Sequence, residues 1–307
     1  MSSKSRGSFI ISLDCEGLWG MVDNPSAIGN GVISQASLAH AYEHIVSTLG
    51  RNNLIATAAF VSSFACPVHI LRDNLAHFEA MAEIEPIWFS PIVERLKNGK
   101  LDGWCGSTFY ETMKSAGFEM AWHGATHLPL SEATSKAAVN AELQLAAQLH
   151  DELGRNPTTV IFPRNKVGHL ALLSRAGFRV YRDGPKRHVL GKASNLLDEF
   201  NIYSPSEMTP PAYREGWFVC PPGHFLNWPK GSRGIIPAKV TVMRWKSMLR
   251  DAAERGGSVH MWFHPHNFVT APKMLALFEE VTRFASELVR IGELSNPTMA
   301  ESVFLPK

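Results

Sequence analysis

The fold class follows from residues 8–16, which read SFIISLDCE. Residues 8–13 are mostly apolar, which is the pattern of a short strand buried on both faces. Asp14 and Glu16 come directly after this strand. A buried strand that ends in two carboxylates is typical of a parallel sheet whose strand ends carry the chemistry.

Strand and helix patterns alternate from this stretch to the end of the chain. Further strands are expected at residues 54–61, 118–122, 159–162, 178–181 and 258–263. Helices are expected at residues 38–49 behind Ser34 as N-cap, at 139–153 before Gly154, and at 167–175, 240–253 and 274–288. Repeated strand–helix units indicate an α/β fold with helices packed outside a parallel sheet. No linker or internal repeat divides residues 1–307, so we expect a single domain.

Two long stretches interrupt this alternation. Residues 62–117 are longer than a simple crossover between strands, and residues 183–236 are rich in Pro, Gly and Asn. We expect both to be irregular insertions that form lids, binding loops or contacts in a homo-oligomer.

The composition excludes several classes of function. Of the 307 residues, 45% are hydrophobic and 19% are charged, and the formal net charge is +2. Because no basic run is present, nucleic acid is not expected as a partner. No apolar run is long enough for a membrane span. No hydrophobic signal segment precedes residue 8, so a cytoplasmic location is expected.

Polar residues gather where the predicted strands end. They are Asp14, Glu16, His123, His127, Arg164, Arg182, Asp183, His264, His266 and Asn267. In parallel α/β folds the carboxyl ends of the strands meet on one side of the molecule. We therefore expect these residues, which span 250 positions, to converge on one mouth.

One histidine pair has the spacing and position of metal ligands. Three pairs share the HxxxH spacing: His40 with His44, His123 with His127, and His260 with His264. The first lies within a predicted helix, and the last lies along a strand, where four residues span about 13 Å. Only the middle pair leaves a strand for a loop, where a single helical turn would bring both imidazoles to one ion. Asp14 or Glu16 would complete the set, unless these carboxylates only cap the following turn.

Four segments in this order resemble the polysaccharide deacetylase superfamily, also called the nodulation-factor deacetylase homology domain. They are SLDCEG at 12–17, WHGATH at 122–127, FPRN at 162–165 and WFHPH at 262–266. The resemblance implies a distorted (β/α)7 barrel. It also implies hydrolysis of N-acetyl, or sometimes O-acetyl, groups of sugars with a divalent metal ion, most commonly zinc.

The resemblance also implies a role for each matching residue. The metal ligands would be Glu16, His123 and His127. Asp14 would be the general base, Arg164 the residue that orients it, and His264, or alternatively His266, the general acid. Three motifs depart from the usual pattern: an Asp-Asp pair is spread into Asp-x-Glu, the Ser or Thr that usually follows the first metal histidine is Gly124, and an Arg-x-Pro-Tyr segment is reduced to Pro163-Arg164-Asn165.

The expected substrate is an amino sugar. Strand alternation puts Trp262 on the same face as His264, so its ring is predicted to contact the sugar. The other expected substrate-binding residues are Trp19, Asp183, His266 and Asn267. Because no export signal is present, the chain is expected to act on a small cytoplasmic precursor of a surface polysaccharide.

Three alternatives stay open at this point. A set of two histidines and one carboxylate also binds ferrous iron in oxygenases, although these usually have a different fold. The same site could hydrolyse another C–N bond, such as that of a ureide or a formamide. The loosened motifs also fit a non-catalytic descendant that binds a glycan.

Overall fold

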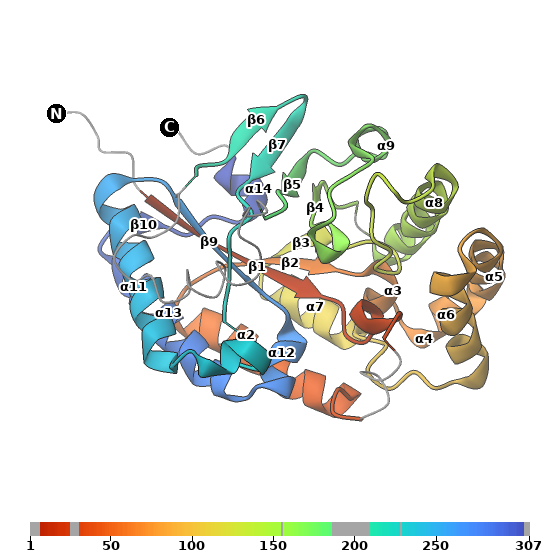
Figure 1. Cartoon of the computed structure of the whole chain (residues 1–307), viewed down its shortest axis with the longest axis horizontal. Coiled ribbons are helices and arrows are strands. Elements are labelled where there is room, and N and C mark those ends of the chain that lie inside the picture. The colour runs from red at the N-terminus through yellow and green to blue at the C-terminus, as the bar shows by residue number, and fades with distance from the viewer. Residues whose placement is uncertain (1–6, 25–30, 155, 186–208, 228, 304–307) are drawn as a thin grey trace.

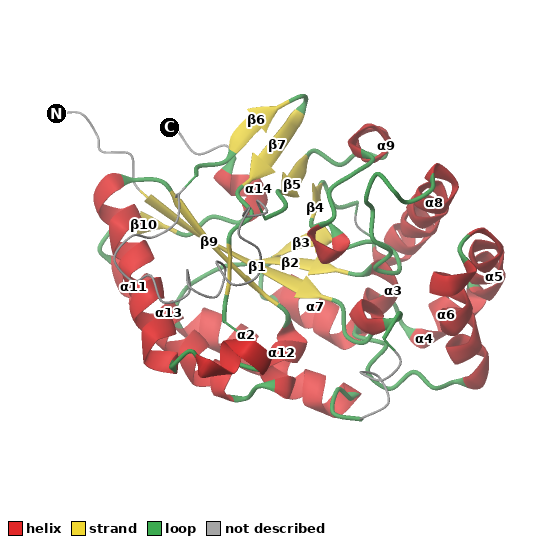
Figure 2. Ribbon diagram, in the orientation of Figure 1, coloured by secondary structure: helices red, strands yellow, loops and turns green. Residues whose placement is uncertain are grey.

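The computed structural model describes residues 7–24, 31–154, 156–185, 209–227 and 229–303. In this part of the chain, the strands form one sheet in the middle of the molecule and helices surround it (Figures 1 and 2). The strands are β1 (Gly7–Cys15), β2 (Thr57–Phe60), β3 (Glu119–Trp122), β4 (Thr159–Val160), β5 (Val180–Arg182), β6 (Ala212–Arg214), β7 (Trp217–Cys220), β8 (His224–Phe225), β9 (Ser258–Phe263) and β10 (Leu294–Ser295). Strand β1 is buried along its whole length, as its apolar sequence predicts.

The sheet closes on itself through a bend between two strands. The strand order is β6-β7-β5-β4-β3-β2-β1-β9-β8, with β10 beside β1, and only the β6–β7 pair is antiparallel. Strand β7 pairs with β5, β8 pairs with β9, and only residues 221–223 separate β7 from β8. With β7 and β8 taken as one bent strand, seven strands surround the interior, which is the distorted barrel predicted above.

The bend itself requires a glycine. Gly223 has a φ of +68°, and a Cβ atom there would lie 2.6 Å from the carbonyl oxygen of His260. A side chain at this position would therefore clash with the backbone of β9. The glycine lets the chain cross from one edge of the sheet to the other at close range.

The barrel interior holds an apolar cluster, and along β1 it becomes polar toward the carboxyl end of the strand. The apolar cluster consists of residues from several strands and one C-terminal helix: Ile10, Ala59, Ala121, Ile161, Val180, Cys220 and Met299. Along β1, Ile10, Ser12 and Asp14 share the interior side, because alternate residues of a strand face the same way. The polar chemistry is therefore concentrated at one end of the barrel.

The predicted outer helices are present. They are α2 (Gln35–Arg51), α8 (Lys136–Leu153), α9 (Leu170–Arg175), α11 (Ala238–Arg255) and α13 (Lys273–Arg290). Two shorter helices, α12 (Pro265–Thr270) and α14 (Met299–Ser302), complete the C-terminal part. Ser34 caps α2 by accepting a hydrogen bond from the backbone N–H of Ser37, and Gly154 ends α8 in a left-handed conformation. No helix among the described residues is both long and apolar enough to cross a bilayer.

The prediction that residues 62–117 form an irregular insertion is wrong. They form α3 (Ser62–Ala65), α4 (Val68–Asp73), α5 (Leu75–Ile84), α6 (Pro86–Asn98) and α7 (Ser107–Ser115). In α6 the buried residues Trp88, Phe89, Ile92 and Leu96 follow a helical spacing. These helices are short and begin or end at Pro67, Pro86 and Gly99, and these breaks hide the periodicity from a long sequence window.

Residues 183–236 are only partly described. The described part contains the β6–β7 hairpin, β8 and the 3₁₀ turn η3 (Gly231–Ile235). Residues 186–208 and 228 lie outside the described residues, so the expected irregular insertion there is not assessed.

Candidate metal centre and active site

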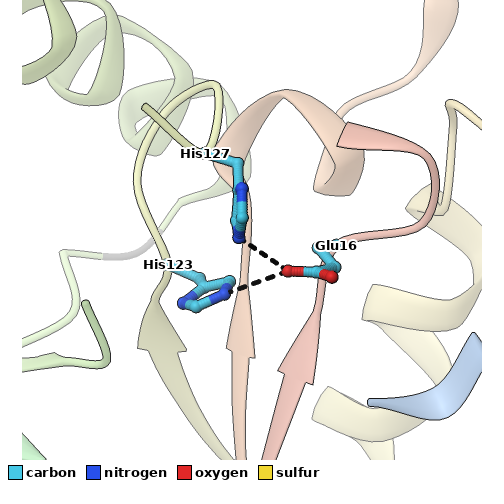
Figure 3. A group of neighbouring side chains, drawn as sticks. All are labelled: Glu16, His123 and His127. Atoms are coloured by element: carbon cyan, nitrogen blue, oxygen red, sulfur yellow. Dashed lines mark hydrogen bonds and ion pairs between the residues drawn. The ribbon is translucent and has the colours of Figure 1, made fainter. Parts of the chain in front are cut away.

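Three side chains meet at the carboxyl ends of β1 and β3. Glu16 follows β1, His123 follows β3, and His127 lies four positions further along the chain. Glu16 Oε2 lies 2.7 Å from His127 Nε2 and 3.3 Å from His123 Nε2. Both imidazole rings point at the carboxylate, and the three ligand atoms lie within 4.8 Å of one another (Figure 3). The structure thus brings the three predicted ligands together in a buried group.

The turn between the two histidines is not the single helical turn that the sequence predicts. Residues 123–127 are irregular, with φ angles of +82° at Gly124 and +68° at His127. A helical turn requires negative φ at every residue, so the chain reverses here by a different route. The two rings still reach the same side, because the turn folds His127 back toward the end of β3.

The surroundings of Glu16 keep its carboxylate ionised. His123 Nδ1 donates to the carbonyl oxygen of Ile161 at 2.7 Å, so that Nε2 is the ring nitrogen that faces Glu16. Burial lowers the pKa of His127 below its usual value, although the Glu16 carboxylate acts in the opposite direction. Burial alone would raise the pKa of Glu16, but the charges of His127 and His264 and the histidine hydrogen bonds hold it well below its usual value. A carboxylate and two imidazoles that face one another form a donor set that could hold a divalent metal ion.

Glu16 also depends on a small neighbour. A Cβ atom on Gly20 would lie 2.2 Å from Glu16 Oε1. The absence of a side chain at this position lets the carboxylate take its orientation between the histidines and the adjoining cavity.

Asp14 is paired with Arg182. Arg182, the last residue of β5, donates from Nη1 to Asp14 Oδ1 at 2.8 Å and from Nη2 to Oδ2 at 2.7 Å. Both residues are buried, and Arg182 also donates to Ser12 Oγ and Asn165 Oδ1. Burial alone would raise the pKa of Asp14, but the Arg182 guanidinium, with smaller effects from His123 and His264, lowers it below its usual value. Asp14 is therefore held as an oriented carboxylate.

The expectation that Arg164 orients Asp14 is not met. Arg164 Nη1 donates to Asp23 Oδ2 at 2.7 Å, and its guanidinium lies over the ring of Trp88. Arg164 has a φ of +56° in the turn η2 (Pro163–Asn165), and this backbone conformation directs its side chain away from the barrel interior. Side-chain alternation along β5 indicates the residue that does pair with Asp14, because Arg182 faces the same interior side as Val180.

Two histidines line the opposite side of Glu16. His264 Nε2 lies 3.7 Å from Glu16 Oε1 and 3.9 Å from Asp14 Oδ2. Its Nδ1 lies 3.2 Å from Asn267 Oδ1, which also accepts a hydrogen bond from the His264 backbone N–H. His266 Nδ1 lies 3.8 Å from Glu16 Oε1, and burial, together with the His264 charge, lowers the pKa of His266 to about 4. His264 is the more exposed of the two and borders the adjoining cavity.

That cavity has a volume of about 340 Å³. Its walls include Glu16, Met21, Phe225, His264, His266 and Thr270. The ring of Trp262 lies 4.7 Å from that of Phe225 and 5.8 Å from that of His264, centroid to centroid. Phe225, which the sequence did not single out, therefore joins Trp262 in an aromatic surface beside the candidate site.

Of the five expected substrate-binding residues, His266 and Asn267 line this cavity, and Trp262, Trp19 and Asp183 do not. Trp19 is fully buried, donates from Nε1 to the carbonyl oxygen of Trp104 at 2.8 Å, and packs edge-on against the Trp104 ring. Asp183 accepts a hydrogen bond from the backbone N–H of Gly184 and lies 3.9 Å from Arg214 Nη1. The strand pattern could not show this, because both residues lie just beyond a strand, where alternation no longer fixes direction.

Comparison with known proteins gives the class of fold. No family profile matches the sequence, and no curated protein sequence is similar to it. Among the solved structures with a similar fold are three that cover almost the whole chain. A protein described as a polysaccharide deacetylase from Mycobacterium smegmatis has 15% identity and a TM-score of 0.64, over 99% of this chain and 91% of that one. A second, from Pseudomonas aeruginosa PAO1, has 12% identity and a TM-score of 0.59, over 98% and 90%.

The third similar structure is the PuuE allantoinase, with 12% identity and a TM-score of 0.58 over 99% of this chain and 91% of that one. At these identities the similarity concerns the fold. The chain has the (β/α) barrel fold of the polysaccharide deacetylase superfamily, as its motifs predict.

Proposed function

We propose that this protein is a metal-dependent hydrolase that removes an N-acetyl or other acyl group from an amino sugar. One observation carries the proposal: the buried Glu16, His123 and His127 lie beside a carboxylate–guanidinium pair and an accessible histidine at the carboxyl ends of the strands. This arrangement offers a cation site, a proton acceptor and a proton donor at the same end of the barrel.

Glu16, His123 and His127 would hold the ion, most plausibly zinc on the chemistry of the donor set. A divalent ion bound there would polarise the acyl carbonyl and lower the pKa of a coordinated water from about 16 toward 7. The protein contributes the orientation of its ligands, above all through the hydrogen bond from His123 Nδ1 to Ile161.

Asp14 would act as the general base. Its carboxylate lies next to the ligand group but is held by Arg182, so it stays ionised and free to accept a proton from the attacking water. The two carboxylates would have different roles because they have different partners: Glu16 faces two imidazoles, and Asp14 faces a guanidinium.

His264 would act as the general acid. Its Nε2 lies between the two carboxylates and the cavity, while Asn267 occupies its Nδ1. From there it can protonate the departing nitrogen, which is a poor leaving group without a proton. The deeper burial of His266 supports His264 over the alternative, since burial favours the neutral form of His266, whose remaining N–H is a very weak acid.

The cavity supports a ring-shaped substrate of modest size. Phe225, which packs against Trp262, would offer an apolar ring face to a sugar, and Asn267 and Thr270 would offer hydrogen bonds to its hydroxyl groups. The cytoplasmic location and the role in making a surface-polysaccharide precursor stay predictions from the sequence.

A second candidate is the hydrolysis of a non-sugar C–N bond, such as that of a ureide. The similarity of the fold to an allantoinase favours keeping it. Both candidates use the same residues and differ in the substrate that the cavity admits.

The test is the release of acid from defined substrates by the zinc-loaded protein. N-acetylglucosamine oligomers, acetylated nucleotide sugars and ureides would be compared, with Asp14→Asn as the matched inactive variant. The proposal expects Asp14-dependent release of acetate, or of another acyl acid, from at least one amino sugar. Turnover of ureides alone would support the second candidate, and binding of sugars without any turnover would support a glycan-binding protein.

A further inference from the structure

The turn that carries the two metal histidines rests on a buried carboxylate that the reaction does not use. Glu142 lies in the middle of α8 and is fully buried. Its Oε2 accepts hydrogen bonds from the backbone N–H groups of Ala125 at 2.8 Å and Thr126 at 3.1 Å. Its Oε1 accepts a further hydrogen bond from the hydroxyl of Thr126. One side chain thus satisfies three donors between His123 and His127.

The opposite side of the turn is held by backbone groups. The carbonyl oxygens of Gly124 and Ala125 accept hydrogen bonds from the N–H groups of Ser62 and Ser63, each at 3.0 Å. These contacts fix the turn against the start of α3, while Glu142 fixes it against α8. Because Ala125 and Thr126 are buried, water does not replace Glu142 as the acceptor of their N–H groups.

His127 depends on this turn more than His123 does. The ring of His123 is fixed by its hydrogen bond to Ile161, whereas His127 Nδ1 has no hydrogen-bond partner among the described residues. The ring of His127 instead stacks on Trp88, at a centroid distance of 6.5 Å and an interplanar angle of 25°. Trp88 Nε1 donates to Thr126 Oγ1, the same hydroxyl that donates to Glu142.

We propose that Glu142 is a positioning residue for the metal centre, which holds the 123–127 turn and the Trp88–Thr126 contact so that the His127 ring faces Glu16. The proposal rests on the metal site proposed above. Glu142 would contribute to cation affinity without touching the ion, in the way that residues behind metal ligands orient them.

The experiment measures zinc affinity by competition with a chromophoric chelator at pH 7.5. The variants are Glu142→Ala, Glu142→Gln and Thr126→Val, and the control is Glu152→Gln, which alters an exposed carboxylate on the same helix. We expect the dissociation constant to rise about 10- to 100-fold in Glu142→Ala and by a smaller factor in Glu142→Gln and Thr126→Val. Glu152→Gln is expected to match the wild type.

Urea unfolding of the zinc-free proteins separates positioning from a loss of stability. A Glu142 variant that unfolds cooperatively and still binds zinc within about threefold of the wild type overturns the proposal. Should Glu142→Ala fail to fold, Glu142→Gln decides the question by the same criterion. If the wild type binds no zinc, or His127→Ala binds it equally well, the metal site itself fails, and the role of Glu142 fails with it.

Discussion

Arg182 and Asp14 come from positions 168 residues apart in the sequence and form a doubly hydrogen-bonded ion pair in the polar end of the barrel. The pair sits beside, and not within, the group of metal-ligand candidates. Because of this geometry, Asp14 is an ionised carboxylate that has no imidazole within hydrogen-bond distance.

Removal of Arg182 is expected to change the pH dependence of turnover. In Arg182→Met the pKa of Asp14 should rise, because burial then acts without the opposing charge. The acid limb of the kcat/KM profile should therefore move to higher pH. Arg164→Met removes a charge that pairs with Asp23 on the surface, so its profile should match the wild type.

A conservative variant of Arg182 tests the same prediction. Arg182→Lys keeps the charge but loses the paired hydrogen bonds, so it should shift the acid limb less than Arg182→Met. An unshifted limb in a folded Arg182→Met, or a shift in Arg164→Met instead, would contradict the assignment of Arg182 to Asp14.

Asp14→Asn separates proton transfer from metal binding. The amide keeps the shape of the side chain but accepts a proton poorly, so kcat should fall by about 100- to 10,000-fold. Zinc content should stay at the wild-type level, because Glu16 supplies the carboxylate of the ligand group. Metal analysis and turnover on one preparation check both points, and a loss of zinc would make Asp14 a ligand.

Trp19 and Trp262 are expected to differ in what they support. Trp19→Ala removes a fully buried ring and should lower the free energy of unfolding by about 3–5 kcal/mol. Trp262→Ala should instead raise KM, since this ring borders the aromatic surface beside the cavity. Urea unfolding and steady-state kinetics on both variants distinguish the two roles. A raised KM in Trp19→Ala together with a lowered free energy of unfolding in Trp262→Ala would instead assign Trp19 to the substrate site.

His150 makes folding stability sensitive to acid. Burial lowers its pKa from 6.5 to about 4, so below pH 6.5 the unfolded chain binds a proton that the folded chain does not. Stability should fall as the pH drops from about 6.5 to 4, by up to about 3 kcal/mol from this residue. In His150→Gln the curve of unfolding free energy against pH should be flatter over this range. Parallel curves for the wild type and the variant would contradict this origin.

The pattern of short apolar strands that alternate with helices predicted the parallel sheet, and the resemblance of four motifs to the deacetylase superfamily implied the barrel. The position of His123 and His127 after a strand end indicated that they meet a carboxylate from the end of the first strand, and the resemblance selected Glu16 rather than Asp14. The residue that orients Asp14 was assigned wrongly, because a positive φ at Arg164 reverses the direction of a side chain that its motif places nearby. Glu142 could not be found from the sequence, because a carboxylate in the middle of an amphipathic helix has the same pattern whether it faces solvent or a buried turn.

The most direct measurement is the zinc content of the purified wild-type protein beside that of His123→Ala. His40→Ala serves as the control, because His40 belongs to an HxxxH pair on an exposed part of α2. The account predicts one equivalent of zinc in the wild type and in His40→Ala, and a loss of that equivalent in His123→Ala. Equal zinc in all three proteins, or none in the wild type, would contradict it.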